Sequence, residues 1–186
     1  MRKNILFGLA FISAIAVLSS CGGKTPAEPK PAAEAEPCEI VIGNKIDDDN
    51  GYWSWNYLVA LDQVVTSGTT VYKLGIKLKY DSDYILAIYD DNAGEPGVVL
   101  AQTAPQTGVI GWNEAAVTTP VLLSAGSKYW LVSITGFDSI TDNTDSGIVK
   151  YKSYLYTTAA SSGMPGSLTG WNDNSGRTKV YATSCR

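Results

Sequence analysis

The sequence predicts an all-β fold, a single antiparallel β-sandwich with jelly-roll-like connections. Three observations lead to this prediction. Short segments with alternating apolar and polar residues recur along the chain, clusters of Gly, Asn and Asp separate them, and no window carries the pattern of a long amphipathic helix. Residues 21–186 are enough for one domain with its own core, and we place the sandwich at residues 38–186.

The clearest predicted strand is residues 72–80, where a Tyr, Leu or Ile at every second position alternates with Lys or Gly. In residues 84–89, we expect Leu86 and Ile88 on one face, and Ile85, Ala87 and Tyr89 on the other. Trp130, in the middle of an apolar segment, is expected in the core. The remaining predicted strands are residues 39–42, 57–65, 98–103, 115–119, 129–134, 148–156 and 178–183. The main turn clusters are residues 47–51, 90–97, 138–147, 161–166 and 172–176.

The first 20 residues have the organisation of a secretory signal. Arg2 and Lys3 precede an apolar stretch at residues 5–18. This stretch is shorter than a transmembrane helix usually needs, and no stop-transfer charges follow it. We therefore expect residues 1–20 to be removed during export.

The next feature is Leu18-Ser19-Ser20-Cys21, which resembles the lipobox of bacterial lipoproteins. The resemblance implies that Cys21 receives a diacylglyceryl group, that the chain is cut before it, and that the new amino terminus is acylated. Two or three acyl chains, at about 0.8 kcal/mol per buried CH2, anchor a protein permanently to a bilayer. In that family's sorting rule, a residue other than an acidic one after the lipidated Cys directs the protein to the outer membrane, so Gly22 implies the outer membrane. The alternative is an ordinary signal peptide with a Cys near the cut.

Residues 21–37 form the predicted connection between the lipid and the sandwich. The segment after Cys21 is rich in Pro, Ala, Glu and Lys and has nothing apolar enough to bury. We expect a disordered tether that reaches at most roughly 50 Å in polyproline form. The predicted location is therefore the bacterial envelope, on the outer membrane or the cell surface, with the domain outside the cytoplasm.

The two other cysteines, Cys38 and Cys185, bracket the predicted domain in an oxidising compartment. We expect a disulfide that joins the first strand to the last. A disulfide that closes so long a loop restricts the unfolded chain, and this loss of entropy would stabilise the folded domain by at most about 4–5 kcal/mol. Three Cys without a single His cannot build an ordinary structural zinc site.

Charge excludes some partners. Removing Arg2 and Lys3 leaves 12 basic residues against 18 acidic ones, a net charge of −6. This balance argues against nucleic acid and against electrostatic docking on anionic lipid.

Residues 84–103, YILAIYDDNAGEPGVVLAQT, resemble a strand–turn–strand signature of extracellular bacterial β-sandwich domains, which are carbohydrate-binding-module-like or uncharacterised. Gly-Trp at residues 111–112, Ser-Ala-Gly at 124–126 and Tyr-Trp-Leu-Val at 129–132 match the continuation of that signature. The similarity spans most of residues 56–183. The resemblance implies a sandwich fold. Because such domains occur beside many different activities, it gives little information about function.

We expect that the protein is not an enzyme. The absence of His excludes Ser-His-Asp and Cys-His centres and His-ligated metals. A hydrolase with paired carboxylates remains as an alternative. Its candidate residues all lie in predicted turns, where Asp caps the backbone: Asp47, Asp48, Asp49, Asp90, Asp91, Asp142 and Asp145.

Tryptophans next to amide side chains are the better functional signal. An indole can stack on the apolar face of a sugar while Asn or Asp binds its hydroxyls. The candidate ligand-binding residues are Trp53, Trp55, Asn56, Trp112, Asn113, Trp171 and Asn172. For Trp112 and Trp171 the alternative is structural, because Gly-Trp can open a strand and cap the core.

Two acidic turns are candidates for a structural Ca2+ site, and no other cofactor is expected. Clustered carboxylate and amide oxygens suit Ca2+. The candidate ligands are Asp47, Asp49, Asp90 and Asn92. The alternative is that these turns are solvated and bind nothing.

Together, the sequence predicts a surface lipoprotein, held in a lipid bilayer through acylated Cys21, that displays a non-catalytic binding module for a glycan. The alternative is a structural lipoprotein that binds a protein of the cell envelope. That alternative predicts a contiguous apolar patch on one sheet.

Overall fold

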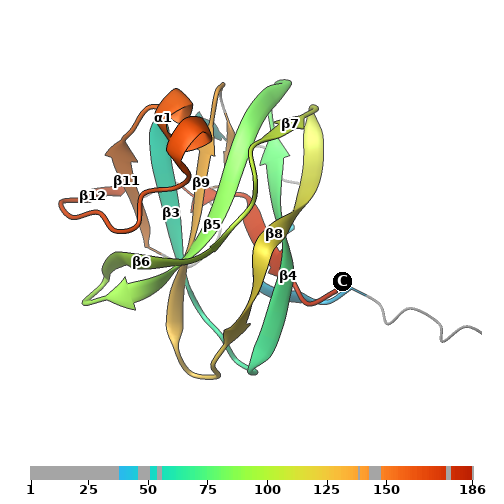
Figure 1. Ribbon diagram of the computed structural model, residues 1–186, viewed down its shortest axis with the longest axis vertical. Helices are drawn as coiled ribbons and strands as arrows, with labels where there is room; N and C mark the ends of the chain where they lie inside the picture. Colours follow the sequence, from blue (N-terminus) through green and yellow to red (C-terminus); the bar gives the residue numbers. More distant parts are fainter. Residues whose placement is uncertain are drawn as a thin grey trace, which may run out of the picture. The chain divides into compact units, whose positions relative to one another are not determined.

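The computed structural model describes residues 38–45, 51–53, 56–137, 139–142, 148–174 and 177–185. The predicted signal, Cys21 and the tether lie outside the described residues. The described strands form two antiparallel sheets, which confirms the predicted all-β sandwich (Figure 1).

Sheet A has the hydrogen-bonded order β1-β14-β4-β10-β13, with β2 beside β10 and β8 beside β4. Its strands are β1 (Ile40–Gly43), β2 (Gly51–Trp53), β4 (Thr69–Leu78), β8 (Gly111–Leu123), β10 (Ser139–Asp142), β13 (Arg177–Thr178) and β14 (Val180–Thr183). Ile40 pairs with Thr183, so the first and last strands of the domain are neighbours.

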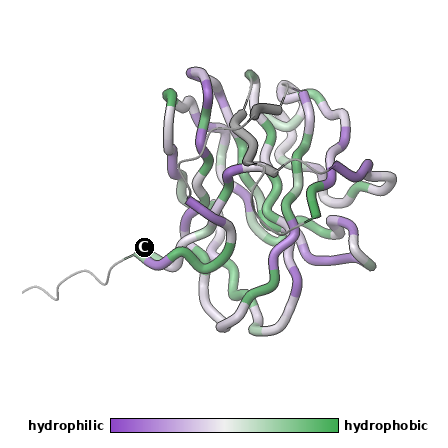
Figure 2. The backbone as a smooth tube through the Cα atoms, turned by 180° about the vertical axis from the view of Figure 1, so that it is seen from behind, coloured by the Kyte–Doolittle hydropathy of each residue, from purple (hydrophilic) through white to green (hydrophobic). Residues whose placement is uncertain are grey.

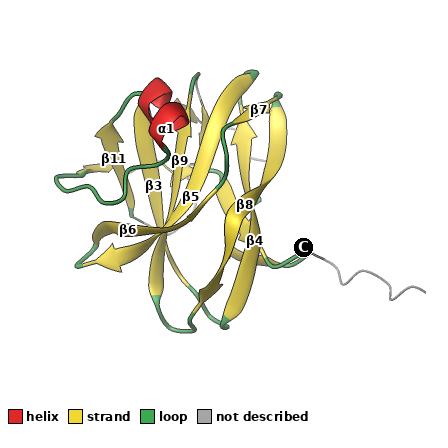
Figure 3. Ribbon diagram, viewed as in Figure 1, coloured by secondary structure: helices red, strands yellow, loops and turns green. Residues whose placement is uncertain are grey.

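Sheet B has the order β12-β11-β3-β9-β5-β6, with β7 beside β5. Its strands are β3 (Tyr57–Val64), β5 (Ser82–Asn92), β6 (Glu95–Gln102), β7 (Gln106–Gly108), β9 (Lys128–Thr135), β11 (Val149–Ser153) and β12 (Asn172–Asn174). One short helix, α1 (Tyr156–Ser162), lies against this sheet among the described residues (Figure 3).

The first core fills the space between the two sheets. Alternating residues of β4 enter it, and the Lys and Gly residues between them face outward, as the period of two predicts. Leu86 and Ile88 of β5 meet them from sheet B. One β-bulge, between Val71 and Lys73 opposite β8, shifts this register.

A second core covers the outer face of sheet B. Ile85, Ala87 and Tyr89 are buried there, on the face of β5 opposite Leu86 and Ile88, as predicted. Trp130 is fully buried in the same cluster. The cover consists of α1 and the residues around it, 154–171, which we call the covering segment. The central strands β3, β9 and β5 are therefore buried on both faces.

Hydrogen bonds to buried groups hold the covering segment in place. The Tyr89 hydroxyl donates to the carbonyl of Pro165 at 2.7 Å, and the Met164 N–H donates to Oε1 of Gln102 at 2.7 Å. Burial, with a smaller effect of Tyr154, raises the pKa of Tyr89 above its ordinary value, so this hydroxyl remains a neutral donor. The second core is thus fixed by specific contacts as well as by apolar burial.

Helix α1 departs from the sequence prediction, which places a strand over residues 148–156. The strand ends at Ser153, and the helix begins at Tyr156. Its first N–H donates to Oδ1 of Asn56 at 3.0 Å, and the Asn56 carbonyl accepts from Tyr154 N–H at 3.0 Å. A residue 100 positions away therefore supplies the cap, which outweighs the local β-propensity of the Tyr- and Thr-rich segment.

The predicted turn at residues 90–97 is also shorter in the structure. Strand β5 continues to Asn92, and β6 begins at Glu95. The two residues between them, Ala93 and Gly94, have φ of 53° and 84°, as a type I′ hairpin loop requires. This tight hairpin belongs to the segment with the strand–turn–strand signature.

The distribution of apolar and polar residues matches the position of the two cores. Seen from behind, apolar residues gather on the strands inside the domain, and hydrophilic residues mark many of the loops (Figure 2). In the part of the chain that the structure describes, no helix is long and apolar enough to cross a membrane.

The predicted disulfide is confirmed. Cys38 and Cys185 are bonded, with Cα atoms 4.7 Å apart. The bond lies just outside the β1–β14 pair, so it closes a loop that contains both sheets.

We expect the double variant Cys38→Ala/Cys185→Ala to lower the free energy of unfolding by up to about 4–5 kcal/mol, because the unfolded chain regains the entropy of the loop. Urea unfolding followed by Trp fluorescence measures this change. Reduction of the unsubstituted chain should have the same effect, and the variant should not respond to reductant. An unchanged midpoint would show that the disulfide contributes no stability.

Candidate functional site

A surface cavity of about 320 Å³ lies at one end of the sandwich, where β4 ends and β5 begins. We call it the end cavity. It is lined by Asp81, Ser82, Asp83, Thr107, Gly108, Gly136 and Phe137. Strand pairing brings these residues together, because β5 pairs with β7 at Ser82–Gly108 and with β9 at Tyr84–Thr135.

Hydrogen bonds fix the walls of the end cavity. Oδ1 of Asp81 accepts the N–H of Ile110 at 2.9 Å, and Oδ1 of Asp83 accepts the Thr107 hydroxyl at 2.7 Å. The N–H of Gly136 donates to the carbonyl of Asp83 at 2.9 Å. Each carboxylate thus uses one oxygen to hold a loop, and its second oxygen has no partner among the described residues.

Aromatic side chains form one rim of the end cavity. The rings of Tyr80 and Phe137 meet edge to face, with centroids 6.0 Å apart, and the two residues are 42% and 55% exposed. Nζ of Lys79 lies 5.4 Å from the centroid of the Tyr80 ring. Val109 and Ile110, in the loop that Asp81 holds, are exposed as well. The cavity therefore combines polar lining residues with an apolar rim.

The end cavity lies far from the start of the domain. Glu39 and Ile40 line a separate hollow with residues 66–69, which lead into β4. The end cavity follows the other end of β4, after Leu78. The end cavity and the hollow at Glu39 and Ile40 thus lie at opposite ends of β4.

Strand β2 extends toward the same end. Trp53 pairs with Ser139, which also pairs with Leu78, and Ser139 is two residues beyond Phe137. The backbone of Trp53 therefore lies beside the strand ends that lead to Tyr80 and Phe137. The side chain of Trp53 and the whole of Trp55 lie outside the described part of the structure. Asn56 is described, and its side chain caps α1.

Trp171 is part of the second core. It is 7% exposed, and its Nε1 donates to the Leu168 carbonyl at 3.3 Å. Asn172 follows it as an exposed residue of β12. This position fits the structural alternative for Trp171, because its ring covers sheet B.

Trp112 lies on the outer face of sheet A, away from Trp171. Its ring contacts the ring of Tyr181 edge to face at 5.3 Å, and Nζ of Lys45 lies 5.8 Å from its centroid. Tyr181 is buried against Gly75, where a Cβ would come within 2.2 Å of its ring. Its hydroxyl donates to Glu114. Burial first, and then this hydrogen bond, raise the pKa of Tyr181 above its ordinary value.

The two tryptophans on opposite sheets cannot bind the same small ligand. Asn113, beside Trp112, has a local structural contact: its Oδ1 accepts from Val109 N–H at 3.0 Å and its Nδ2 donates to the Val109 carbonyl at 2.7 Å. It therefore shapes the loop at the rim of the end cavity.

The candidate calcium ligands are only partly described. Oδ1 of Asp90 accepts the N–H of Val98 across the β5–β6 hairpin, and Asn92 is exposed at the turn. Asp47 and Asp49 lie outside the described residues. Within the described ranges, no group of three or more His, Cys, Asp or Glu side chains could hold a metal ion.

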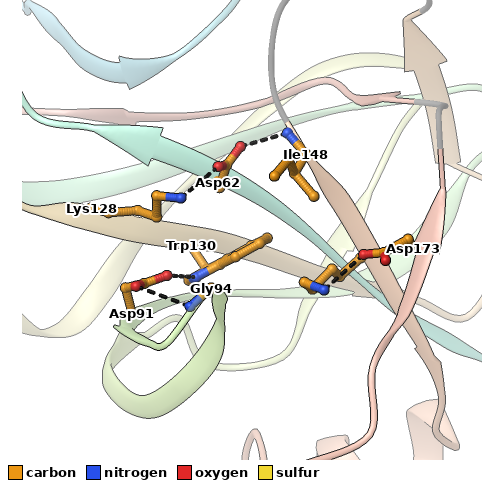
Figure 4. Close-up of polar contacts among 8 residues, drawn as sticks. Asp62, Asp91, Gly94, Lys128, Trp130, Ile148 and Asp173 are labelled. Atoms are coloured by element: carbon orange, nitrogen blue, oxygen red, sulfur yellow. Dashed lines mark hydrogen bonds and ion pairs between the residues drawn. The ribbon is translucent and has the colours of Figure 1, made fainter.

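Other carboxylates of sheet B also hold the fold. Asp91 accepts from Nε1 of Trp130 at 2.9 Å and from Gly94 N–H at 3.2 Å (Figure 4). Asp62 accepts from the Ile148 N–H at 2.6 Å and pairs with Lys128 at 3.2 Å (Figure 4). Asp173 binds Nζ of Lys150 at 2.7 Å.

Sequence reasoning missed the residues of the end cavity. The available signal was Tyr80-Asp81-Ser82-Asp83, where two carboxylates lie between two predicted strands, directly after an aromatic residue that ends the first strand. Phe137 comes near them only through the pairing of β9 with β5.

No protein-family model matches the chain, and no curated protein matches it. The functional proposal therefore depends on the chemistry of the site.

We expect Trp171→Ala to lower the free energy of unfolding by about 3–5 kcal/mol, because it removes a large buried side chain from the second core. Trp112→Ala is the matched control and should cost less, since that ring is only half buried on the outer face of sheet A. Urea unfolding of both variants distinguishes the two positions. Equal losses would contradict the structural role of Trp171.

Proposed function

We propose that the protein is a non-catalytic lipoprotein of the bacterial envelope that binds a glycan at the end cavity. The observation that carries the proposal is the pairing of polar lining residues, Asp81, Asp83 and Thr107, with two exposed aromatic rings, Tyr80 and Phe137. A volume of about 320 Å³ lies within the usual range for small-molecule sites.

Sugar rings need both parts of this surface. Their C–H faces pack on aromatic rings, and their hydroxyls donate to carboxylates and exchange hydrogen bonds with hydroxyl groups. Asp81 and Asp83 each have an oxygen available for such a bond, and their other oxygens hold the walls rigid. A site whose walls are already ordered loses little entropy on binding.

The proposed anchor agrees with the position of the site. We propose that Cys21 is lipidated, that residues 21–37 act as a tether, and that the domain stands outside the cytoplasm on the outer membrane or cell surface. The end cavity lies at the end of the sandwich away from Glu39 and Ile40. In this arrangement the lipid holds the domain at the membrane surface.

Binding rather than hydrolysis is the proposed role of the two carboxylates. A glycosidase holds its general acid protonated by burial. Asp81 and Asp83 are both exposed, and each is tied to a loop. The sequence also lacks His, which removes the commonest alternative acid–base residue.

A protein partner is the second candidate, favoured by the exposure of Val109 and Ile110 beside the aromatic pair. Apolar side chains of this kind suit a protein interface. They lie at one end of the sandwich and not across a sheet, which makes a small ligand the better fit.

We expect the full-length protein in detergent to bind selected glycans on an array, and Phe137→Ala and Tyr80→Ala to weaken binding about threefold to tenfold each. The reason is the loss of a ring that stacks on the sugar. Leu122→Ala is the control, because this residue is 69% exposed and pairs with Thr70 near the other end of β4. Calorimetry on the strongest array hit measures the change.

A paired variant, Trp53→Ala/Trp55→Ala, tests the tryptophans that the sequence singled out, and it should also weaken binding. The proposal fails if no glycan binds, or if all of these variants bind as the unsubstituted chain does. Release of shorter oligosaccharides from a bound glycan would replace the binding role by an enzymatic one.

We expect the chain, made in a bacterial host, to incorporate labelled palmitate and to sediment with membranes. Cys21→Ala should abolish both, because it removes the thiol that carries the diacylglyceryl group. Cys38→Ala is the control, since this cysteine is bonded to Cys185. Label that persists in Cys21→Ala would contradict the anchor while leaving the binding site untested by this experiment.

A further inference from the structure

We propose that the end cavity selects glycans that carry a cationic amino group, such as a glucosamine residue without its acetyl group. This inference rests on the proposed glycan-binding function and adds the charge of the ligand to it. It is argued from the lining residues, the unused carboxylate oxygens and the aromatic pair.

The lining of the end cavity has charge of one sign. It contains the two carboxylates of Asp81 and Asp83 and, among the described residues, no Lys or Arg. Uronic acids, sulfated sugars and phosphates would meet repulsion there, and an ammonium group would meet attraction.

The geometry also leaves the carboxylates able to accept donors. Each holds its loop through Oδ1, with partners Ile110 N–H and the Thr107 hydroxyl. Neither Oδ2 has a partner in the described part of the chain. An ammonium group has three donors and no acceptor, so it matches two carboxylate oxygens better than a hydroxyl does.

The Phe137 ring favours the same ligand. Nζ of Lys79 lies 5.4 Å from the centroid of Tyr80, so that ring already faces a cation, and Phe137 is the ring that remains for a ligand cation. Phe137, 6.0 Å from Tyr80, lines the cavity itself and presents a second exposed ring. Aromatic rings beside carboxylates are the combination that binds amines in water, because the ring faces attract the cation after it loses part of its hydration.

Glycine at residue 136 provides a way to close the cavity without removing any polar group. A Cβ there would lie 3.7 Å from the Tyr156 ring and 3.8 Å from Oγ of Ser82, which is ordinary contact. Because Gly136 lines the end cavity, we expect a larger side chain there to reduce its volume. At Gly166, which belongs to the covering segment, a Cβ would meet nothing within 4 Å, so this position offers a matched control.

The experiment compares two probes by calorimetry on the full-length protein in detergent: a β-1,4-linked glucosamine tetramer and its fully N-acetylated counterpart. We expect the amino form to bind about threefold to tenfold more tightly, and the difference to shrink as salt rises. The double variant Asp81→Asn/Asp83→Asn should remove the difference in affinity, because it removes both negative charges. The walls should remain ordered, since the Asn side-chain oxygens can still accept the hydrogen bonds from Ile110 and Thr107.

Two controls separate the site from general effects. Glu39→Gln/Glu95→Gln removes the same two negative charges from positions outside the end cavity and should leave the preference intact. Gly136→Leu should abolish binding of both probes, and Gly166→Leu should not. Thermal unfolding of each variant confirms that the domain is folded.

The outcomes distinguish this inference from the function on which it rests. Equal binding of both probes, blocked by Gly136→Leu, would overturn the charge preference and retain the glycan site. A preference lost equally in Glu39→Gln/Glu95→Gln would also overturn it, because net charge would then explain the effect. Absence of binding by any glycan would overturn the proposed function and this inference together.

Discussion

The burial of sheet B on both faces is the constraint on which the rest of the structure depends. Leu86 and Ile88 of β5 face sheet A, while Ile85, Ala87 and Tyr89 face the covering segment. Neither face of the central strands can be exposed to water without a large loss of apolar burial. The covering segment must therefore remain in place, and the Tyr89 hydroxyl and the Asn56 side chain fix its position. Trp171 completes the cover, so its ring serves stability.

This constraint bears on where the proposed glycan would bind. The outer face of sheet B is occupied by the covering segment, and on the outer face of sheet A the Tyr181 ring lies over Gly75 beneath Trp112. Loops at the ends of the strands keep their side chains available. At the end after β4, strand pairing brings Asp81 and Asp83 beside Phe137, and each loop is held by a hydrogen bond to a carboxylate. The strands thus order a small cavity with polar lining residues and an aromatic rim, which suits the proposed glycan recognition.

Much of the fold could be predicted from the sequence, because alternation in residues 72–80 and the positions of Cys38 and Cys185 are local signals. The continuous apolar run at residues 84–89 was also a signal of two-sided burial. Helix α1 could not be predicted in the same way. It has seven residues, and its cap comes from Asn56, 100 positions earlier. The end cavity was hidden for a similar reason: Phe137 meets Tyr80 only through the register of distant strands.

Hydrogen exchange of the full-length protein, with and without a bound glycan from the array, tests the central claim most directly. Ligand at the end cavity should slow exchange at residues 80–83, 106–110 and 135–137. The central strands and residues 164–171 of the covering segment should exchange slowly in both states, because the second core is already closed. Protection that appears instead across the covering segment or the outer face of sheet A would contradict the account.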